Sequence, residues 1–294
     1  MKKSDKKNVG LRALKKSTKS KALPFSVLIP IYKKEKPEYF DDALKSIFSQ
    51  TVLPNEVVIC EDGLLTKELD KIVNKYKRKY PKILKIVKFK ENRGLGRTLR
   101  DGVLKCSNEI IFRADSDDIS LPNRFEKQLE FLKENNIDVI GSTISEFDEK
   151  MEKHTGDRIV PERNRDIVIF AERRNPINHM SVGFKKSKVL AAGNYQDMPG
   201  FEDYFLWVRM LMMGCEFYNL QGPLVKVRGG SSMIRRRGGR KYTNSLIKFE
   251  RTIYKRGFIT RIELFENIFL RSIASFSPNF IREKFYQKTL RGRA

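Results

Sequence analysis

Three aspartates occupy four positions in the segment RADSDD, residues 113–118, directly after the apolar run NEIIF. Carboxylates this close repel one another unless a cation or a hydrogen-bond donor offsets their charge. Asp115 and Asp117 alternate at the end of an expected strand, so both could reach one hard divalent cation, Mn²⁺ or Mg²⁺. A solvated turn is one alternative. A helix N-cap by Asp118 or Ser120 is another, but it would explain one residue and leave the pair unexplained.

Two further acidic pairs stand at the edges of apolar segments. Glu61 and Asp62 end the run NEVVICEDG, where they could form a simple turn with Gly63 at positive φ or accept an N–H of a nucleotide base. Glu202 and Asp203 open the apolar segment GFEDYFLW, where the helix dipole favours acids. The functional alternative for the second pair is a general base held at a helix start. Neither acidic pair, taken alone, shows whether its role is structural or functional.

The segment ENRGLGR, residues 91–97, has the composition of a phosphate-binding loop, with Asn92, Arg93 and Gly94 at its centre. The chain contains neither the GxGxxG dinucleotide fingerprint nor the GxxxxGK[ST] phosphate loop. The first expected strand is followed by PIYKKEKP and not by a glycine-rich turn. These observations argue against Rossmann dehydrogenases and P-loop NTPases.

The elements that must position these residues alternate between strand and helix. Apolar runs predict strands at 25–32, 55–63, 84–89, 108–118 and 138–147, and helical spacing predicts helices at 37–51, 66–81, 94–106 and 122–135. This alternation predicts an α/β fold with a mostly parallel central sheet flanked by helices. Ligands of such sheets bind beyond the carboxyl ends of the strands. The acids near 33–35, 61–62 and 115–118 are therefore expected to converge.

The pattern is looser after residue 150. We expect a loop that enters a strand at 175–186, an amphipathic helix at 200–214, a strand with a glycine-rich basic loop at 224–241, and helices from about 243 onward.

The formal charge of +24 is concentrated in three segments of the 294 residues. Residues 1–21 carry a net +8, residues 226–241 carry +7 and residues 251–294 carry +7, which leaves a nearly neutral body. Such appendages suit a nucleic acid, an anionic membrane surface or a phosphorylated substrate. Three cysteines without ligand spacing indicate reduced thiols in the cytosol. The Lys-rich start lacks the apolar stretch of a signal peptide, and no run is long enough to span a membrane.

Five motifs follow one another in a familiar order: SVLIPIYKKE, VVICEDG, ENRGLG, RADSDDISLPNRF and GFEDYFLW. Together they resemble family 2 glycosyltransferases, nucleotide-sugar enzymes of the GT-A fold, over about residues 25–240. Within that family, NPINHMSVGF and GGSSMIRRRGG are most similar to bacterial capsule and exopolysaccharide transferases of the amylovoran-biosynthesis type.

The resemblance implies roles for residues at matching positions. Those implied for the nucleotide pocket and the donor diphosphate are Pro30, Tyr32, Glu35, Asp62, Asn92, Arg93, Gly94, Asp115, Ser116, Arg235 and Arg236, with Arg237 beside the last two. Asp62 would accept the N–H of uracil or another base. Asp115 and Asp117 would flank the metal, Asp203 would be the catalytic base, and His179 and Glu202 would border the acceptor.

The resemblance also divides the chain. It implies a GT-A catalytic domain at 24–241, with a nucleotide-binding half at 24–120 and an acceptor-binding half at 121–241. Residues 1–23 are expected to be a disordered basic tail, and 242–294 a basic helical extension.

The implied function is an inverting, metal-dependent transfer of a sugar from a nucleotide donor, expected to be a UDP-sugar. The expected acceptor is a lipid-linked saccharide in capsule, exopolysaccharide or O-antigen synthesis. A sugar-nucleotide pyrophosphorylase is an alternative, but it would carry a glycine-rich signature after the first strand. A basic nucleic-acid-binding protein is the other alternative. Because the charge lies at the ends and in one loop, with no recognisable reading module, no nucleic-acid partner is expected.

The apolar residues of segment 262–276 leave two interpretations open. They form one helical stripe of Ile262, Phe265, Ile268, Phe269, Ile273 and Phe276. A stripe of this kind packs on the catalytic domain or lies in the plane of a membrane, helped by nearby basic residues. The expected location is the cytoplasm. If the stripe lies in the plane of a membrane, the protein is expected to attach peripherally to the inner face of the cytoplasmic membrane.

Overall fold

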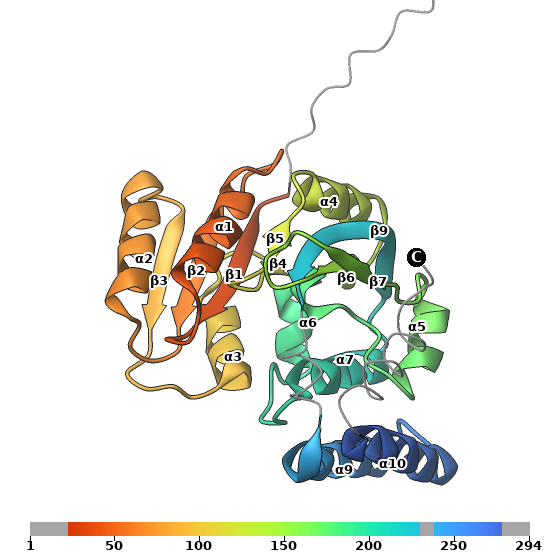
Figure 1. Cartoon of the computed structure of the whole chain (residues 1–294). Coiled ribbons are helices and arrows are strands. Elements are labelled where there is room, and N and C mark those ends of the chain that lie inside the picture. The colour runs from red at the N-terminus through yellow and green to blue at the C-terminus, as the bar shows by residue number, and fades with distance from the viewer. Residues whose placement is uncertain (1–22, 230–237, 278–294) are drawn as a thin grey trace, which may run out of the picture.

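The chain folds into a layered α/β structure with a pair of helices at one end (Figure 1). A computed structural model describes residues 23–229 and 238–277. Its first half contains β1 (Phe25–Ile31), α1 (Pro37–Phe48), β2 (Glu56–Glu61), α2 (Lys67–Lys79), β3 (Leu84–Lys88), α3 (Leu95–Lys105) and β4 (Ile110–Arg113). The second half contains β5 (Ile119–Ser120), α4 (Arg124–Glu134), β6 (Val139–Phe147), β7 (His154–Arg158), α5 (Asn164–Ala171), β8 (Gly183–Lys185), α6 (Lys186–Ala191), α7 (Glu202–Met212) and β9 (Phe217–Arg228), followed by α9 (Gly239–Lys255) and α10 (Arg261–Phe276).

The predicted alternation of strands and helices is confirmed through β6, except that the unpredicted two-residue strand β5 follows β4 without a helix between them. The sheet has the order β3-β2-β1-β4-β8-β6-β9-β5, and β7 pairs with β6. Pairs among the first four strands are parallel, as predicted. The second half is mixed, because β8 is antiparallel to both β4 and β6 while β9 is parallel to β6. The parallel arrangement therefore describes the first half of the sheet and not the whole.

Apolar side chains on both faces of the sheet explain these elements. All seven residues of β1 are buried, as expected of a parallel strand covered on two sides. Helix α1 begins with Pro37, whose fixed φ suits a first turn. Helices α1, α2 and α4 contribute to the core on one face, and α3, α6 and α7 contribute to the core on the other. The position of α3 depends on Gly102, where a Cβ would lie 2.6 Å from Cδ1 of Leu28.

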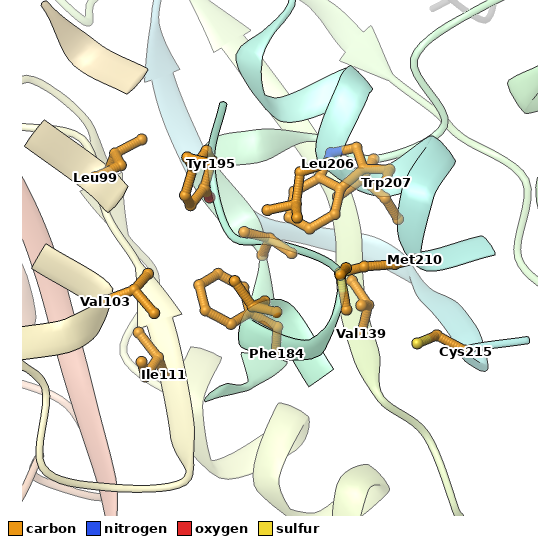
Figure 2. Close-up of a cluster of buried hydrophobic side chains, with 14 of the residues drawn as sticks. Leu99, Val103, Ile111, Val139, Phe184, Tyr195, Leu206, Trp207, Met210 and Cys215 are labelled. Carbon is orange, nitrogen blue, oxygen red and sulfur yellow. The ribbon is translucent and has the colours of Figure 1, made fainter. Parts of the chain in front are cut away.

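Helix α7 differs from its prediction, because it is buried on all sides and not amphipathic. Every residue from Tyr204 to Leu211 is buried. Trp207, Leu206 and Met210 project into the core beside Phe184 (Figure 2). The opposite side of α7 is covered by α9, where Phe249 stacks on Phe201 at 4.9 Å. Helix α9 thus completes the burial of α7.

Helices α9 and α10 are the described part of the predicted basic extension. They pack against each other beyond α7 (Figure 1). Among the residues described, no helix has the length and apolar composition that a membrane span requires. The predicted tail at 1–23 lies outside the described residues, except for residue 23.

Candidate active site

The central strand of the first half, β1, is a topological switch point. Its neighbours are β2 on one side and β4 on the other, because the chain adds β2 and β3 before it returns to β4. Beyond the paired strands, Asp62 N donates to Ile31 O at 2.7 Å and Ala114 N donates to Leu28 O at 3.1 Å. The segments leaving β2 and β4 therefore flank the end of β1. Open α/β sheets bind their ligands at such a point.

A cluster of carboxylates lies on the β4 side of this point. Asp115, Asp117 and Asp118 each offer an oxygen within 4.8 Å of the others. Burial, followed by the negative charge of Asp117, raises the pKa of Asp118 well above its ordinary value. Ser116 donates to Glu35, so the loop after β1 joins the cluster as expected. Burial and Asp117 also raise the pKa of Glu35, although the bond from Ser116 lowers it in part.

Asp118 does not cap the next helix, contrary to one of the alternatives. The N-cap of α4 is Asn123, which makes no side-chain cap hydrogen bond. Asp118 Oδ1 instead accepts the backbone N–H of Arg228 at 2.9 Å. Arg228 Nε donates to the carbonyl of Asp117 at 3.1 Å, and its guanidinium lies 3.7 Å from the Tyr39 ring. Arg228, at the end of β9, therefore holds the acidic segment through both its own side chain and its own backbone N–H.

Arg113, the first residue of the motif, is a buried cation that sequence reasoning did not single out. Its guanidinium contacts the Asp115 carboxylate, and its side chain is only 4% exposed. Its Nε is buried and has no hydrogen-bond partner among the described residues. Burial lowers the pKa of Arg113, while the acids Asp118 and Asp203 act in the opposite direction. The charges of the acidic cluster and of the candidate base Asp203 therefore both influence the pKa of Arg113.

Asp203 lies in the first turn of α7, with its carboxylate held by a neighbour. Asn175 Nδ2 donates to Asp203 Oδ2 at 2.6 Å, and His179 Nδ1 lies 3.9 Å from the same oxygen. His179 Nε2 is bonded to the Tyr195 hydroxyl at 2.9 Å. Burial and the charge of Arg113 hold the pKa of His179 well below its ordinary value, so the ring is neutral. His179 thus sits beside Asp203, and its predicted contact with the acceptor stays a prediction.

The glycine-rich loop and the acidic pair of α7 touch directly. Gly96, in the first turn of α3, packs so closely on Glu202 that a Cβ would lie 2.8 Å from the Glu202 Cγ. Burial raises the pKa of Glu202. This contact joins the ENRGLG and GFED motifs, which are about a hundred residues apart in the sequence.

Replacing Gly96 with alanine is expected to lower kcat about 10- to 100-fold per folded molecule, because the Glu202 side chain beside Asp203 must move to admit the methyl group. The matched change is Gly102→Ala in the same helix, which clashes with Leu28 in the core. That variant should lose about 1–3 kcal/mol of stability and keep its kcat. Steady-state kinetics and thermal unfolding measure both. A wild-type kcat for Gly96→Ala would remove the positioning role of this contact.

Asp62 is held by the glycine-rich loop. Its carboxylate accepts N–H groups from Asn92, Arg93 and Gly94 at 2.7–3.0 Å. Gly63 has φ +88°, as the turn interpretation predicted. Each carboxylate oxygen has two lone pairs, so this structural role does not exclude a further hydrogen bond to Asp62. The bond from Asp62 to a nucleobase stays a prediction.

The structure describes some of the remaining residues predicted to bind the donor, and others lie outside the described residues. Pro30 is buried within β1, and Tyr32 is 42% exposed just after it. Arg93 lies 3.7 Å from the Phe89 ring and pairs with Asp101. The predicted arginines at 235–237 lie outside the described residues, and Arg235 and Arg236 keep their implied role as a prediction.

Comparison with known proteins decides the family. The sequence model of Glycosyl transferase family 2 matches residues 26–189. This chain is a family 2 glycosyl transferase. It is 37% identical, over 91% of its length and 96% of the other chain, to UDP-Gal:alpha-D-GlcNAc-diphosphoundecaprenol beta-1,3-galactosyltransferase of Escherichia coli. It is 36% identical, over 91% of its length and all of the other chain, to the amylovoran biosynthesis glycosyltransferase AmsE of Erwinia amylovora.

Solved structures agree with the expected fold. The mannosyltransferase PcManGT of Pyrobaculum calidifontis, in complex with GDP-Man and Mn²⁺, matches 86% of this chain and 70% of its own with a TM-score of 0.59 and 17% identity. The prediction of a GT-A fold is confirmed.

The acidic cluster of this glycosyl transferase fits a divalent cation. Three carboxylates converge, and the charge of Asp117 adds to the burial that raises the pKa of Asp118. Oxygen ligands of this kind suit Mg²⁺ or Mn²⁺. The residues that would hold the cation are Asp115 and Asp117, with Asp118 behind them.

Proposed function

We propose that this enzyme transfers a sugar from a nucleotide-sugar donor to a saccharide acceptor with inversion at the anomeric carbon. The observation that carries the proposal is the arrangement at the switch point. Arg113 contacts Asp115 of the acidic cluster, and the negative charges of Asp118 and of the candidate base Asp203 both act on its pKa.

In this mechanism the acidic cluster holds the donor diphosphate, and Asp203 meets the acceptor. A bound Mn²⁺ or Mg²⁺ would offset the charge of the departing nucleoside diphosphate. Asp203 takes the proton from the acceptor hydroxyl as that oxygen attacks the sugar, and the bond to the diphosphate breaks. Asn175 fixes the orientation of Asp203. Only one base is required, because a single displacement forms no covalent intermediate.

The substrates are proposed from the names of relatives. The Escherichia coli relative is named for a UDP-Gal donor and a lipid-linked diphosphate acceptor, and the Erwinia amylovora relative for amylovoran biosynthesis. These names support a UDP-sugar donor, a lipid-linked acceptor and a role in surface polysaccharide synthesis. They also support a cytoplasmic location with peripheral attachment to the membrane.

A donor panel tests this function. Purified protein is incubated with UDP-, GDP- and dTDP-sugars, with Mn²⁺ or Mg²⁺, and with a water-soluble analogue of a glycosyl diphosphate lipid. We expect metal-dependent release of one nucleoside diphosphate and a product of inverted anomeric configuration by NMR. A product of retained configuration would contradict the single displacement. Salt-dependent DNA binding without turnover of any nucleotide sugar would instead favour the nucleic-acid alternative.

A further inference from the structure

Helix α10 turns most of its large apolar side chains outward and buries two polar ones, Asn267 and Ser275. The residues it buries are Leu264, Asn267, Ala274 and Ser275. Six of its eight large apolar side chains are more than half exposed, namely Ile262, Phe265, Phe269, Leu270, Ile273 and Phe276. A surface helix of a globular domain normally has the opposite arrangement. Since soluble monomers rarely expose a contiguous apolar patch of this kind, the face is a candidate interaction surface.

The orientation of α10 is fixed by specific polar contacts. Glu250 of α9 is fully buried, and its carboxylate accepts from Arg271 at 2.7 Å and from Asn267 at 3.1 Å. Asn267 also donates to the carbonyl of Glu172 at 2.8 Å. Rotating the helix to bury its phenylalanines would leave Glu250 charged and unpaired in the interior, at a high cost. A capping box at Thr260 further defines where the helix begins.

Positive charge lies beside the apolar face. Five basic residues of the neighbouring helix α9 are exposed: Arg240, Lys241, Lys248, Arg251 and Lys255. All of α9 is described, and its one acidic residue, Glu250, is buried. Residues 278–294 add five basic residues and one acid in sequence. An apolar helical face next to a basic one has the composition of an in-plane helix on anionic lipid.

Charge also argues against a second copy of this chain as the occupant. Self-association through this face would bring two sets of exposed cations together, and like charges across an interface are unfavourable. An anionic lipid surface matches both the charge and the apolar side chains.

We propose that the outer face of α10, with the basic face of α9, docks the enzyme on an anionic membrane surface with both helices lying along it. Helix α9 also packs on the start of α7, where the Phe249 ring lies 4.6 Å from that of Tyr204, next to Asp203. The docking itself does not depend on the proposed function. The suggestion that docking presents a lipid-linked acceptor to Asp203 does rest on the proposed function.

Vesicle sedimentation of the full chain tests the docking. Wild-type protein should pellet with vesicles of equal parts phosphatidylglycerol and phosphatidylcholine and much less with phosphatidylcholine alone. Phe265→Gln/Phe269→Gln should lower partitioning at least about tenfold, because two exposed aromatic anchors are lost. Lys248→Gln/Arg251→Gln/Lys255→Gln should lower it about fivefold per charge removed. Leu53→Gln/Leu104→Gln, which changes two exposed leucines elsewhere, should bind as wild type does.

Four outcomes would overturn the proposal. The first is unchanged partitioning of the phenylalanine variant. The second is a loss of vesicle partitioning in the charge variant alone, which would mean that the wild-type protein binds anionic vesicles only through charge. The third is no vesicle binding together with a dimer in solution that the phenylalanine variant dissociates, which assigns the face to a second copy. The fourth is vesicle binding that appears only after removal of 278–294, which means that this segment covers the face.

The test is separable from the proposed function. Sedimentation requires no turnover, and transfer to the water-soluble acceptor requires no vesicle. The phenylalanine variant should therefore keep wild-type kcat with the soluble acceptor while it loses vesicle binding.

Discussion

Replacing Asp203 with asparagine is expected to lower kcat for transfer about 10²- to 10⁴-fold and to leave donor affinity unchanged. An amide of nearly the same shape fills the position but cannot take the proton of the acceptor hydroxyl. Donor affinity should persist because the predicted donor residues that the structure describes lie in β1 or in the segments that follow β1 to β4, whereas Asp203 lies on α7. Steady-state transfer kinetics and calorimetric titration with the donor measure the two quantities.

Asp166→Asn is the matched control for this variant. Asp166 is also a carboxylate in the first turn of a helix, but it is exposed on α5. It should keep wild-type kcat and stability. If Asp203→Asn turns over at the wild-type rate, another group is the base, and the neighbouring Glu202 is then the first to change.

Replacing Asp117 with alanine is expected to lower metal-dependent turnover about 100-fold or more. A bound cation contributes several kcal/mol to stabilising the departing charge, and each 1.36 kcal/mol corresponds to a factor of ten. The variant should also need more Mn²⁺ for half-maximal activity. Chelation with EDTA should abolish wild-type turnover, and added Mn²⁺ should restore it.

Stability distinguishes loss of the metal site from loss of the fold. In the absence of metal, Asp117→Ala should be no less stable than the wild type, because Asp117 opposes the ionisation of Asp118 and Glu35. Mn²⁺ should raise the unfolding temperature of the wild type and not of the variant. Asp70→Ala, a partly exposed carboxylate on α2, serves as the control. Full wild-type activity in EDTA would refute the metal site.

The first half of the fold could be predicted because its signals are local. A strand buried on both faces is a continuous apolar run, and a helix on such a sheet has apolar residues at helical spacing. These patterns predicted β1 to β4 and α1 to α4. The acids at strand ends followed from the direction of parallel strands, which is why Glu35 and Asp115–Asp117 were expected together.

The second half depends on contacts between distant segments, which local patterns do not reveal. The short strand β8 enters the sheet between β4 and β6, and β9 pairs with both β6 and β5. Arg113 and Arg228 were missed for a related reason. An arginine in a sequence resembles a surface residue, and its burial depends on partners such as Asp115 and Asp118, which only the fold supplies. The periodicity of α10 located its apolar stripe but could not tell which side faced the solvent.

The link between Asp118 and Arg228 has a consequence for the order in which this molecule assembles. Strand β5 directly follows the acidic segment and pairs with β9, so β4, β8, β6, β9 and β5 make a closed circuit with residues 114–118. The residues that close it are separated by about 110 positions in the chain. Contacts of such long range form late, because the entropy of closing the loop must be overcome first. A nascent chain can therefore complete the first four strands before its acidic segment is held in place. We therefore expect the candidate metal site to be set only when β9 has docked, so that the candidate catalytic centre is among the last parts of the enzyme to take shape.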